Sequence, residues 1–133
     1  MLKTQVKICG FTESKAMIRA EQLGADYLGM VIDFPQVPQS ISSQEAIDLV
    51  TSLRVTRPDV VSKLVGVFVD KSIDELVNLV ETCGLSTVQL HGSESPNYCY
   101  QIRSLKARVL KSFRVQDTAG EQELVDQIRP YVG

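Results

Sequence analysis

Short continuous apolar runs alternate along this chain with longer stretches in which apolar residues recur at helical spacing. A continuous apolar run is typical of a strand buried on both faces of a parallel sheet. The predicted strands occupy residues 5–9, 27–32, 64–69, 87–90 and 108–115. Each is followed by a helical stretch, so the pattern predicts an α/β protein of five strand–helix units with a parallel sheet and right-handed crossovers.

Capping residues mark where the helices begin. Ser42 and Ser72 each stand three residues before a glutamate, the pattern of a capping box. Ser95 precedes a proline suited to the first helical position, and we expect Thr12 to be the N-cap of the first helix. The expected helices run over 12–23, from 42 through 53, from 72 to the glycine at 84, from 95 to about 105, and from about 121 to 128. Residues 33–41 and 55–62 are expected to be loops.

Two architectures fit five such units. One is an open doubly wound sheet, and the other is part of an eight-unit barrel, which typically needs about 200 residues or more. The spacing of the units does not decide between them. The usual nucleotide-binding fingerprints are missing, because no Gly-x-Gly-x-x-Gly follows the first strand and no P-loop is present.

Composition narrows the class of protein. The 133 residues are enough for one domain, which we assign to 1–133. The net charge of −2 and the absence of a basic stripe argue against nucleic acid or a membrane as partner, and no apolar run approaches the roughly 20 residues of a membrane span. The three cysteines fit neither a disulfide framework nor a metal site. We therefore expect a reduced, cytoplasmic protein without a metal.

Cys9 is the first candidate for chemistry. It ends the first predicted strand and is followed by Gly10 and the start of a helix. The chemistry of alternating α/β enzymes lies at the carboxyl edge of the sheet, and a helix amino terminus favours a thiolate. The alternative is that Cys9 is a small buried hydrophobic residue at a strand end, as free cysteines often are.

Several motifs resemble one enzyme family. Lys7-Ile8-Cys9-Gly10-Phe11-Thr12 resembles the opening motif of phosphoribosylanthranilate isomerase, an enzyme of tryptophan biosynthesis. Val88-Gln89-Leu90-His91-Gly92, followed by Glu94, resembles the end of that family's fourth strand. Segments 24–29, 65–69 and 111–115 resemble its second, third and fifth strands, so the resemblance runs the length of the chain.

The resemblance implies a fold and a reaction. The family folds as a (βα)8 TIM barrel and isomerises N-(5-phosphoribosyl)anthranilate, an aminoaldose, to an aminoketose by acid–base catalysis without a cofactor. By this resemblance Cys9 is the general base. The family's general acid ends the sixth strand, and glycine-rich loops of the seventh and eighth strands bind the phosphate. We therefore interpret residues 1–133 as a partial barrel of about five βα units, truncated before the sixth strand.

Two further residues are candidates for substrate binding. His91, the single histidine, falls at a strand end where the family motif implies a pocket-lining group; the alternative is a histidine bonded to backbone. The family usually has Ser-Pro-Arg in the loop after the second strand, and its arginine contacts the anthranilate carboxylate. Here Val37-Pro38-Gln39 stands in that place. Gln39 can donate only a neutral hydrogen bond, which is roughly half as strong as a charge-assisted one.

Two functions from different classes follow. The first is the isomerase, of which we expect the isolated 133 residues to be inactive. The second is a non-catalytic half-barrel that serves as a binding or assembly module. In both, the first and last strands of an unclosed barrel are open edges, and open edges invite pairing with another chain. We therefore expect self-association.

Overall fold

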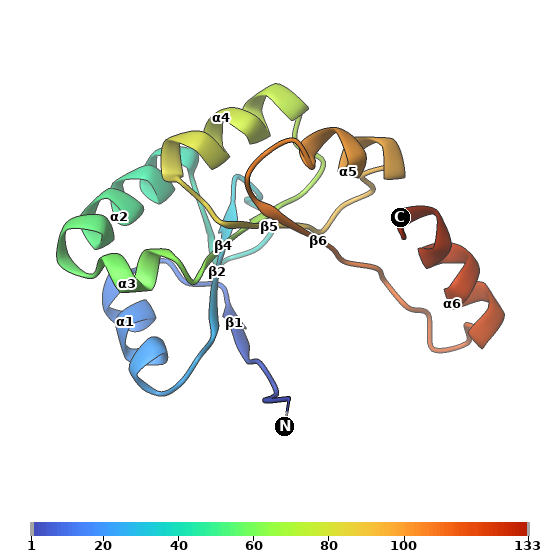
Figure 1. Ribbon diagram of the computed structural model, residues 1–133, viewed down its shortest axis with the longest axis horizontal. Helices are drawn as coiled ribbons and strands as arrows, with labels where there is room; N and C mark the ends of the chain where they lie inside the picture. Colours follow the sequence, from blue (N-terminus) through green and yellow to red (C-terminus); the bar gives the residue numbers. More distant parts are fainter. Residues whose placement is uncertain (1, 133) are drawn as a thin grey trace.

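The computed structural model describes residues 2–132 (Figure 1). Strands and helices alternate as the apolar pattern predicts. The strands are β1 (Lys7–Cys9), β2 (Tyr27–Ile32), β3 (Ser40–Ile41), β4 (Leu64–Phe68), β5 (Thr87–Leu90) and β6 (Arg108–Lys111). The helices are α1 (Ser14–Gln22), α2 (Ser43–Thr56), α3 (Pro58–Val61), α4 (Ile73–Cys83), α5 (Pro96–Ile102) and α6 (Glu121–Ile128), followed by the 3-10 turn η1 (Arg129–Tyr131).

The strand order decides between the two architectures. All pairs are parallel, and the order β1-β2-β4-β5-β6 follows the sequence without reversal. An open doubly wound sheet reverses its order at a switch point, whereas a barrel does not. Right-handed crossovers in a sequential order place the helices on one side, and Figure 1 shows α1 to α5 along the convex side of the curved sheet, with α6 standing apart from it. The fold is that of a partial barrel.

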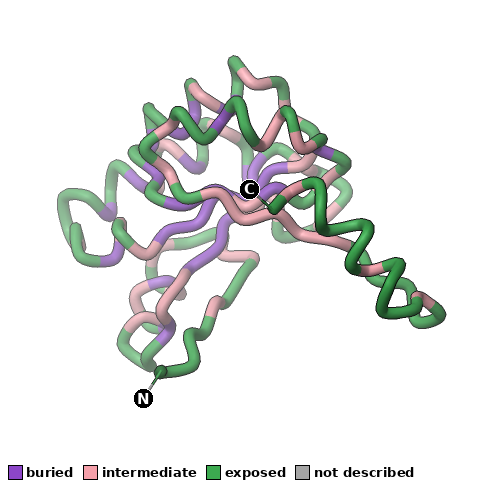
Figure 2. The backbone as a smooth tube through the Cα atoms, turned by 45° about the vertical axis from the view of Figure 1, so that its right-hand side comes forward, coloured by how far each residue is buried: buried purple, intermediate pink, exposed green. Residues whose placement is uncertain are grey.

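The hydrophobic core lies between the sheet and these helices. Its largest fully buried side chains come from both layers, among them Met17 of α1, Leu28 of β2, Leu53 of α2 and Phe68 of β4. Figure 2 shows the buried positions along the central strands and on the sheet-facing sides of the helices. In contrast, α6 has no buried residue.

The strand register identifies the residues of the concave face. Partners in a parallel pair point to the same side of the sheet. Cys9 is in register with Gly29, Gly29 with Val65, Val65 with Thr87, and Thr87 with Arg108. This row, which starts at the candidate base, therefore runs across the face opposite the helical layer.

Several predicted boundaries are wrong. The loop 33–41 contains the short strand β3, which pairs with β2 beyond the end of β1. The loop 55–62 contains α3, because Pro58 occupies the first helical position, where proline is tolerated. The last strand ends at Lys111 rather than 115, since its partner β5 ends at Leu90 and offers later residues no ladder.

The caps are partly as predicted. Ser42 forms the full capping box with Glu45. Ser72 caps the Glu75 amide, but its hydroxyl donates to the Glu75 carboxylate, so the reciprocal backbone bond of a box is not formed. Thr12 is not the N-cap of α1. That helix starts at Ser14, and its N-cap Glu13 makes no side-chain capping bond.

Candidate active site at the carboxyl edge of the sheet

Cys9 is exposed at the carboxyl end of β1. The amides of Gly10 and Phe11 both donate to the Gly29 carbonyl, at 3.0 and 3.1 Å, which turns the chain sharply after the cysteine. Gly10 has φ +95°, a conformation that glycine adopts at no steric cost. The prediction that Cys9 ends a strand at the carboxyl edge of the sheet is confirmed, and the alternative of a buried hydrophobic residue is wrong.

Gly29 makes room for the cysteine. A Cβ at position 29 would lie 2.6 Å from Cys9 Sγ and 3.1 Å from Lys7 Nζ. A real Cβ does not approach other atoms so closely, so only glycine leaves the two side chains where they are. Thiol and ammonium are thus neighbours over one glycine. Within residues 2–132 Lys7 forms no hydrogen bond or ion pair.

Gln39 lies beside the turn that follows Cys9. A Cβ at Gly10 would be 3.3 Å from Gln39 Cβ, so the two loops touch. The Gln39 loop starts at Asp33, whose φ is +54°. The Asp33 carboxylate accepts from the Ser43 amide at 2.8 Å and from Lys71 Nζ at 2.7 Å. Burial raises the pKa of Asp33, but the hydrogen bonds from Lys71 and Ser43 outweigh it and lower the pKa below its ordinary value.

His91 lies at the same edge but on another strand. It follows β5, and its amide donates to the Phe68 carbonyl at 2.9 Å. In the described part of the chain the imidazole has no hydrogen-bond partner. It lines a cleft of about 580 Å³, whose wall also includes Phe34 from the loop after β2. The structure thus places the Gln39 loop beside the turn that follows Cys9, and His91 beside Phe34 at the start of the same loop.

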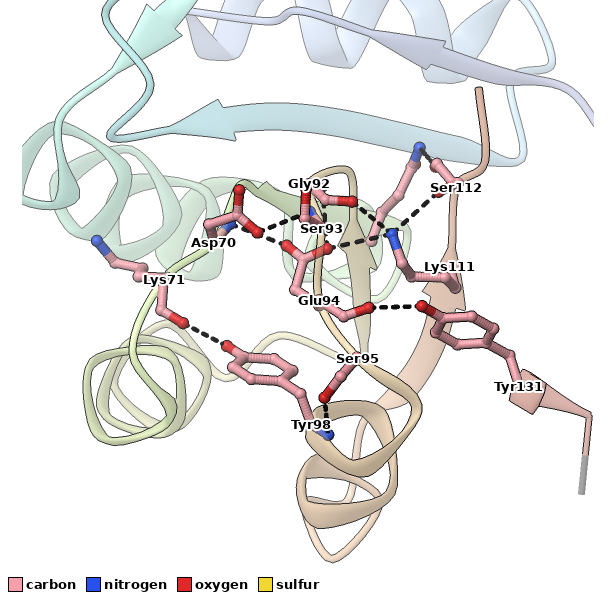
Figure 3. Close-up of polar contacts among 11 residues, drawn as sticks. Asp70, Lys71, Gly92, Ser93, Glu94, Ser95, Tyr98, Lys111, Ser112 and Tyr131 are labelled. Carbon is pink, nitrogen blue, oxygen red and sulfur yellow. Dashed lines mark hydrogen bonds and ion pairs between the residues drawn. The ribbon is translucent and has the colours of Figure 1, made fainter. Parts of the chain in front are cut away.

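A buried ion pair fixes the floor of this cleft (Figure 3). The Glu94 carboxylate accepts from the amides of Asp70 at 2.9 Å and Gly92 at 3.0 Å, and lies 3.2 Å from Lys111 Nζ. The Glu94 side chain is 1% exposed and that of Lys111 10%. Lys111 also donates to the carbonyls of Gly92 and Ser112. The pair therefore joins the ends of β4, β5 and β6, and we call it the Glu94–Lys111 clamp.

Further contacts extend from the clamp. Tyr131 donates its hydroxyl to the Glu94 carbonyl at 2.9 Å, and its ring meets Phe113 edge-on at 5.0 Å. Tyr98 donates to the Lys71 carbonyl at 2.7 Å, and burial, with Glu94 nearby, raises the pKa of Tyr98 to about 12. Tyr98 therefore stays protonated at neutral pH and serves as a donor.

Asp70 takes a structural role at this edge. It has φ +47°, and its carboxylate accepts from the Ser93 amide at 2.7 Å. These contacts make Asp70 a residue that holds the two loops together. Of the other two cysteines, Cys83 is buried and Cys99 is half-buried, and burial raises the pKa of both thiols.

The sequence motifs do not reveal the clamp. In the sequence, Glu94 belongs to a motif after one predicted strand, and Lys111 is a residue of the next predicted strand. One signal was available, because a glutamate four residues after a strand end and a lysine at the next strand end meet at one edge of a parallel sheet. Within residues 2–132 no group of three or more His, Cys, Asp or Glu side chains is placed to hold a metal, and no helix is long and apolar enough to cross a membrane.

Comparison with known proteins decides the family. The family model for N-(5'-phosphoribosyl)anthranilate isomerase matches residues 6–130. The chain belongs to this family. The isomerase of Geobacter sp. (strain M21) is 42% identical over 113 residues, which cover 85% of this chain and 51% of the relative. That of Citrifermentans bemidjiense is 40% identical over 92% of this chain and 55% of the relative.

Solved structures of the isomerase family agree with the fold. The phosphoribosylanthranilate isomerase of Thermus thermophilus is 34% identical, with a TM-score of 0.72 over 88% of this chain and 55% of that one. The Thermotoga maritima isomerase is 28% identical, with a TM-score of 0.79 over 96% of this chain and 57% of that one. This chain spans about half the length of the isomerases it matches. The expected family and fold class are confirmed.

Proposed function

We propose that this chain carries the base side of a phosphoribosylanthranilate isomerase site, in the tryptophan branch of aromatic amino-acid biosynthesis. The reaction converts N-(5'-phosphoribosyl)anthranilate, an aminoaldose, to the aminoketose by an Amadori rearrangement. One observation carries the proposal above all: the motif cysteine is exposed at the carboxyl end of β1, on the concave face of a sheet with barrel topology. That is where (βα)8 enzymes place their catalytic groups.

Cys9 is the general base in this proposal. Once the ribose ring has opened, the thiolate removes the proton from C2, and the enolamine that forms rearranges to the ketone. The thiolate is the basic form of a cysteine, and the rearrangement moves only protons, so it needs no cofactor. Positioned general bases typically contribute 10²- to 10⁴-fold to a rate.

Gln39 and His91 are the proposed substrate-binding residues. The Cβ and Cγ of Gln39 lie against the Gly10 turn, which directly follows the proposed base. His91 lines the adjoining cleft, and its imidazole has no hydrogen-bond partner among residues 2–132. One family member has been solved with reduced 1-(o-carboxyphenylamino)-1-deoxyribulose 5-phosphate, a product analogue. We propose that the same class of ligand lies over the concave face here.

The general acid of this reaction is proposed to come from outside residues 1–133. By the family pattern it is an aspartate that ends the sixth barrel strand, and β6 corresponds to the fifth. We treat 1–133 as one domain of about five βα units, cytoplasmic, and without turnover as an isolated chain. Within residues 2–132, β1 and β6 each pair on one side only, so both edges are open to self-association.

Genetic complementation tests the proposal. Residues 1–133 would be joined to the C-terminal half of the Geobacter isomerase, which is 42% identical to this chain, and expressed in a bacterium that lacks the enzyme. We expect growth without tryptophan, loss of growth with Cys9→Ala, and growth with Cys99→Ala as the matched control. A soluble fusion that never supports growth, or a Cys9→Ala fusion that does, would contradict it.

The alternative is a half-barrel that binds or assembles without catalysis. A neutral Gln39 and exposed strand edges are expected of such a module. Calorimetric titration of the completed protein with the reduced product analogue separates the two functions. Binding that depends on Gln39 and His91 favours the isomerase, whereas no binding by a folded protein favours the module.

A further inference from the structure

The cleft beside His91 has two unbonded nitrogen-bearing side chains. Arg114 follows β6 and is exposed, and in residues 2–132 its guanidinium forms no hydrogen bond or ion pair. His91 lines the same cleft, also without a side-chain partner. The other cation in the wall, Lys111, is held by Glu94 at 3.2 Å. Arg114 is therefore the cation in this wall that a ligand can use.

The rest of the wall is suited to a ring. Phe34 comes from the loop after β2, Phe113 from the segment after β6 and Tyr131 from η1. Phe113 and Tyr131 already pack edge-on, which orders both rings. Small-molecule sites combine aromatic walls with a few placed polar groups in volumes of about 300–1,000 Å³, and this cleft of about 580 Å³ matches that description.

The one carboxylate in the wall does not neutralise Arg114. Asp70 accepts from the Ser93 amide at 2.7 Å, and within residues 2–132 it forms no hydrogen bond or ion pair with Arg114. Glu94 lies beneath the wall and is satisfied by two amides and Lys111. A ligand that combines an aromatic ring with a carboxylate would place its ring among the phenylalanines and the tyrosine, and its charge on the guanidinium.

We propose that Arg114 binds the carboxylate of an aromatic acid in this cleft and determines specificity for it, with His91 as a second donor. The inference rests on the proposed function, because the aromatic acid is then the anthranilate moiety of the substrate. A guanidinium recognises a planar carboxylate through two parallel hydrogen bonds, which an ammonium cannot reproduce. Arg114 touches the substrate but takes no part in proton transfer.

Fluorescence titration of anthranilate with the 133-residue protein tests this proposal. Because hydrogen bonds to charged groups contribute substantially to the free energy of binding, Arg114→Ala should weaken anthranilate binding by about 10- to 100-fold. We expect Arg114→Lys to recover part of the affinity. Arg19→Ala is the matched control, because Arg19 is exposed on α1 and its side chain is also unbonded; it should bind as the parent does.

Two further probes identify what the arginine recognises. Aniline has the ring without the carboxylate, so its binding should be equally weak in the parent and in Arg114→Ala. Inorganic phosphate has the charge without the ring and should not displace anthranilate. The proposal is overturned if the parent does not bind anthranilate, if Arg114→Ala binds it as tightly as the parent, or if phosphate displaces it through Arg114.

Anthranilate binding can be measured without isomerase activity, so the subsite and the proposed function can fail separately. Anthranilate binding that depends on Arg114 in a protein whose completed form shows no isomerase activity would support the subsite and refute the proposed function. If the Arg114→Ala fusion supports growth and the purified fusion has the same KM for the substrate as the parent fusion, the proposed function is supported and the subsite is refuted. Denaturant unfolding of each variant confirms that it is folded, and the exposed Arg114 leaves no buried partner when it is removed.

Discussion

Breaking the Glu94–Lys111 clamp should cost this protein a large part of its stability. Glu94→Gln removes the charge that faces Lys111 at 3.2 Å and turns one acceptor oxygen into a donor. One of the two amides that Glu94 satisfies, those of Asp70 and Gly92, then loses its acceptor. Lys111→Met leaves the carboxylate buried without its cation.

The magnitude follows from burial. The side chains are 1% and 10% exposed, so water compensates little for the loss of either partner. Removing one member of a buried ion pair typically costs about 3–5 kcal/mol, because an uncompensated charge stays behind. A small domain has a total stability of roughly 5–15 kcal/mol. We expect each single variant to lose about 3–5 kcal/mol and the double variant to lose less than the sum.

Urea unfolding followed by circular dichroism measures these differences. Matched controls are Glu81→Gln and Lys106→Met, which change exposed residues whose side chains make no hydrogen bond in the described chain. A Glu94→Gln variant within about 1 kcal/mol of the parent, the range typical of a surface pair, would refute the reasoning. So would strictly additive effects in the double variant.

Three further predictions test the supports of the site. Gly29→Ala would place a Cβ 2.6 Å from Cys9 Sγ, so it should destabilise the protein by about 1–3 kcal/mol and change the rate at which iodoacetamide alkylates Cys9; an unchanged rate and stability would contradict the packing. Ser42→Ala removes the capping box of α2 and should cost about 1 kcal/mol in urea unfolding, whereas a neutral effect would show that the cap is unimportant. Hydrogen bonds from Lys71 and Ser43 lower the pKa of Asp33 below its ordinary value. The ionised carboxylate therefore stabilises the fold at pH values above the pKa that Asp33 has in the unfolded chain. This contribution is lost as the pH falls through the lower pKa of the folded state. Asp33→Asn should therefore destabilise the protein at pH 7, and the difference from the parent should shrink below pH about 4; a difference that grows with acid would reverse the sign.

The sequence predicted elements whose ends are set locally. The continuous apolar run 27–32 and the segment 87–90 are strands with those bounds, and the helix at 121–128 is also as expected. The last strand was predicted too long, because its end depends on where β5 stops. The length of a strand depends on how far its partner strand extends, so it cannot be predicted from the residues of one strand alone.

In the candidate site, too, the features set by local sequence were predictable and those set by contacts between distant segments were not. Cys9 was placed correctly because a strand-to-helix turn puts its last residue at the carboxyl edge whatever the rest of the chain does. The clamp was missed because it exists only where the ends of three strands converge. Glu94 and Lys111 are 17 positions apart in sequence, and nothing local in either segment shows that one neutralises the other.

The turnover of a completed barrel tests the central claim most directly. Residues 1–133, joined to the C-terminal half of the Geobacter isomerase, would be purified and assayed for conversion of N-(5'-phosphoribosyl)anthranilate to the aminoketose. With Cys9 as the general base, Cys9→Ala should lower kcat by at least about 10²-fold and leave the affinity for the reduced product analogue within a few fold. A folded Cys9→Ala protein that keeps the parent's kcat would contradict the account.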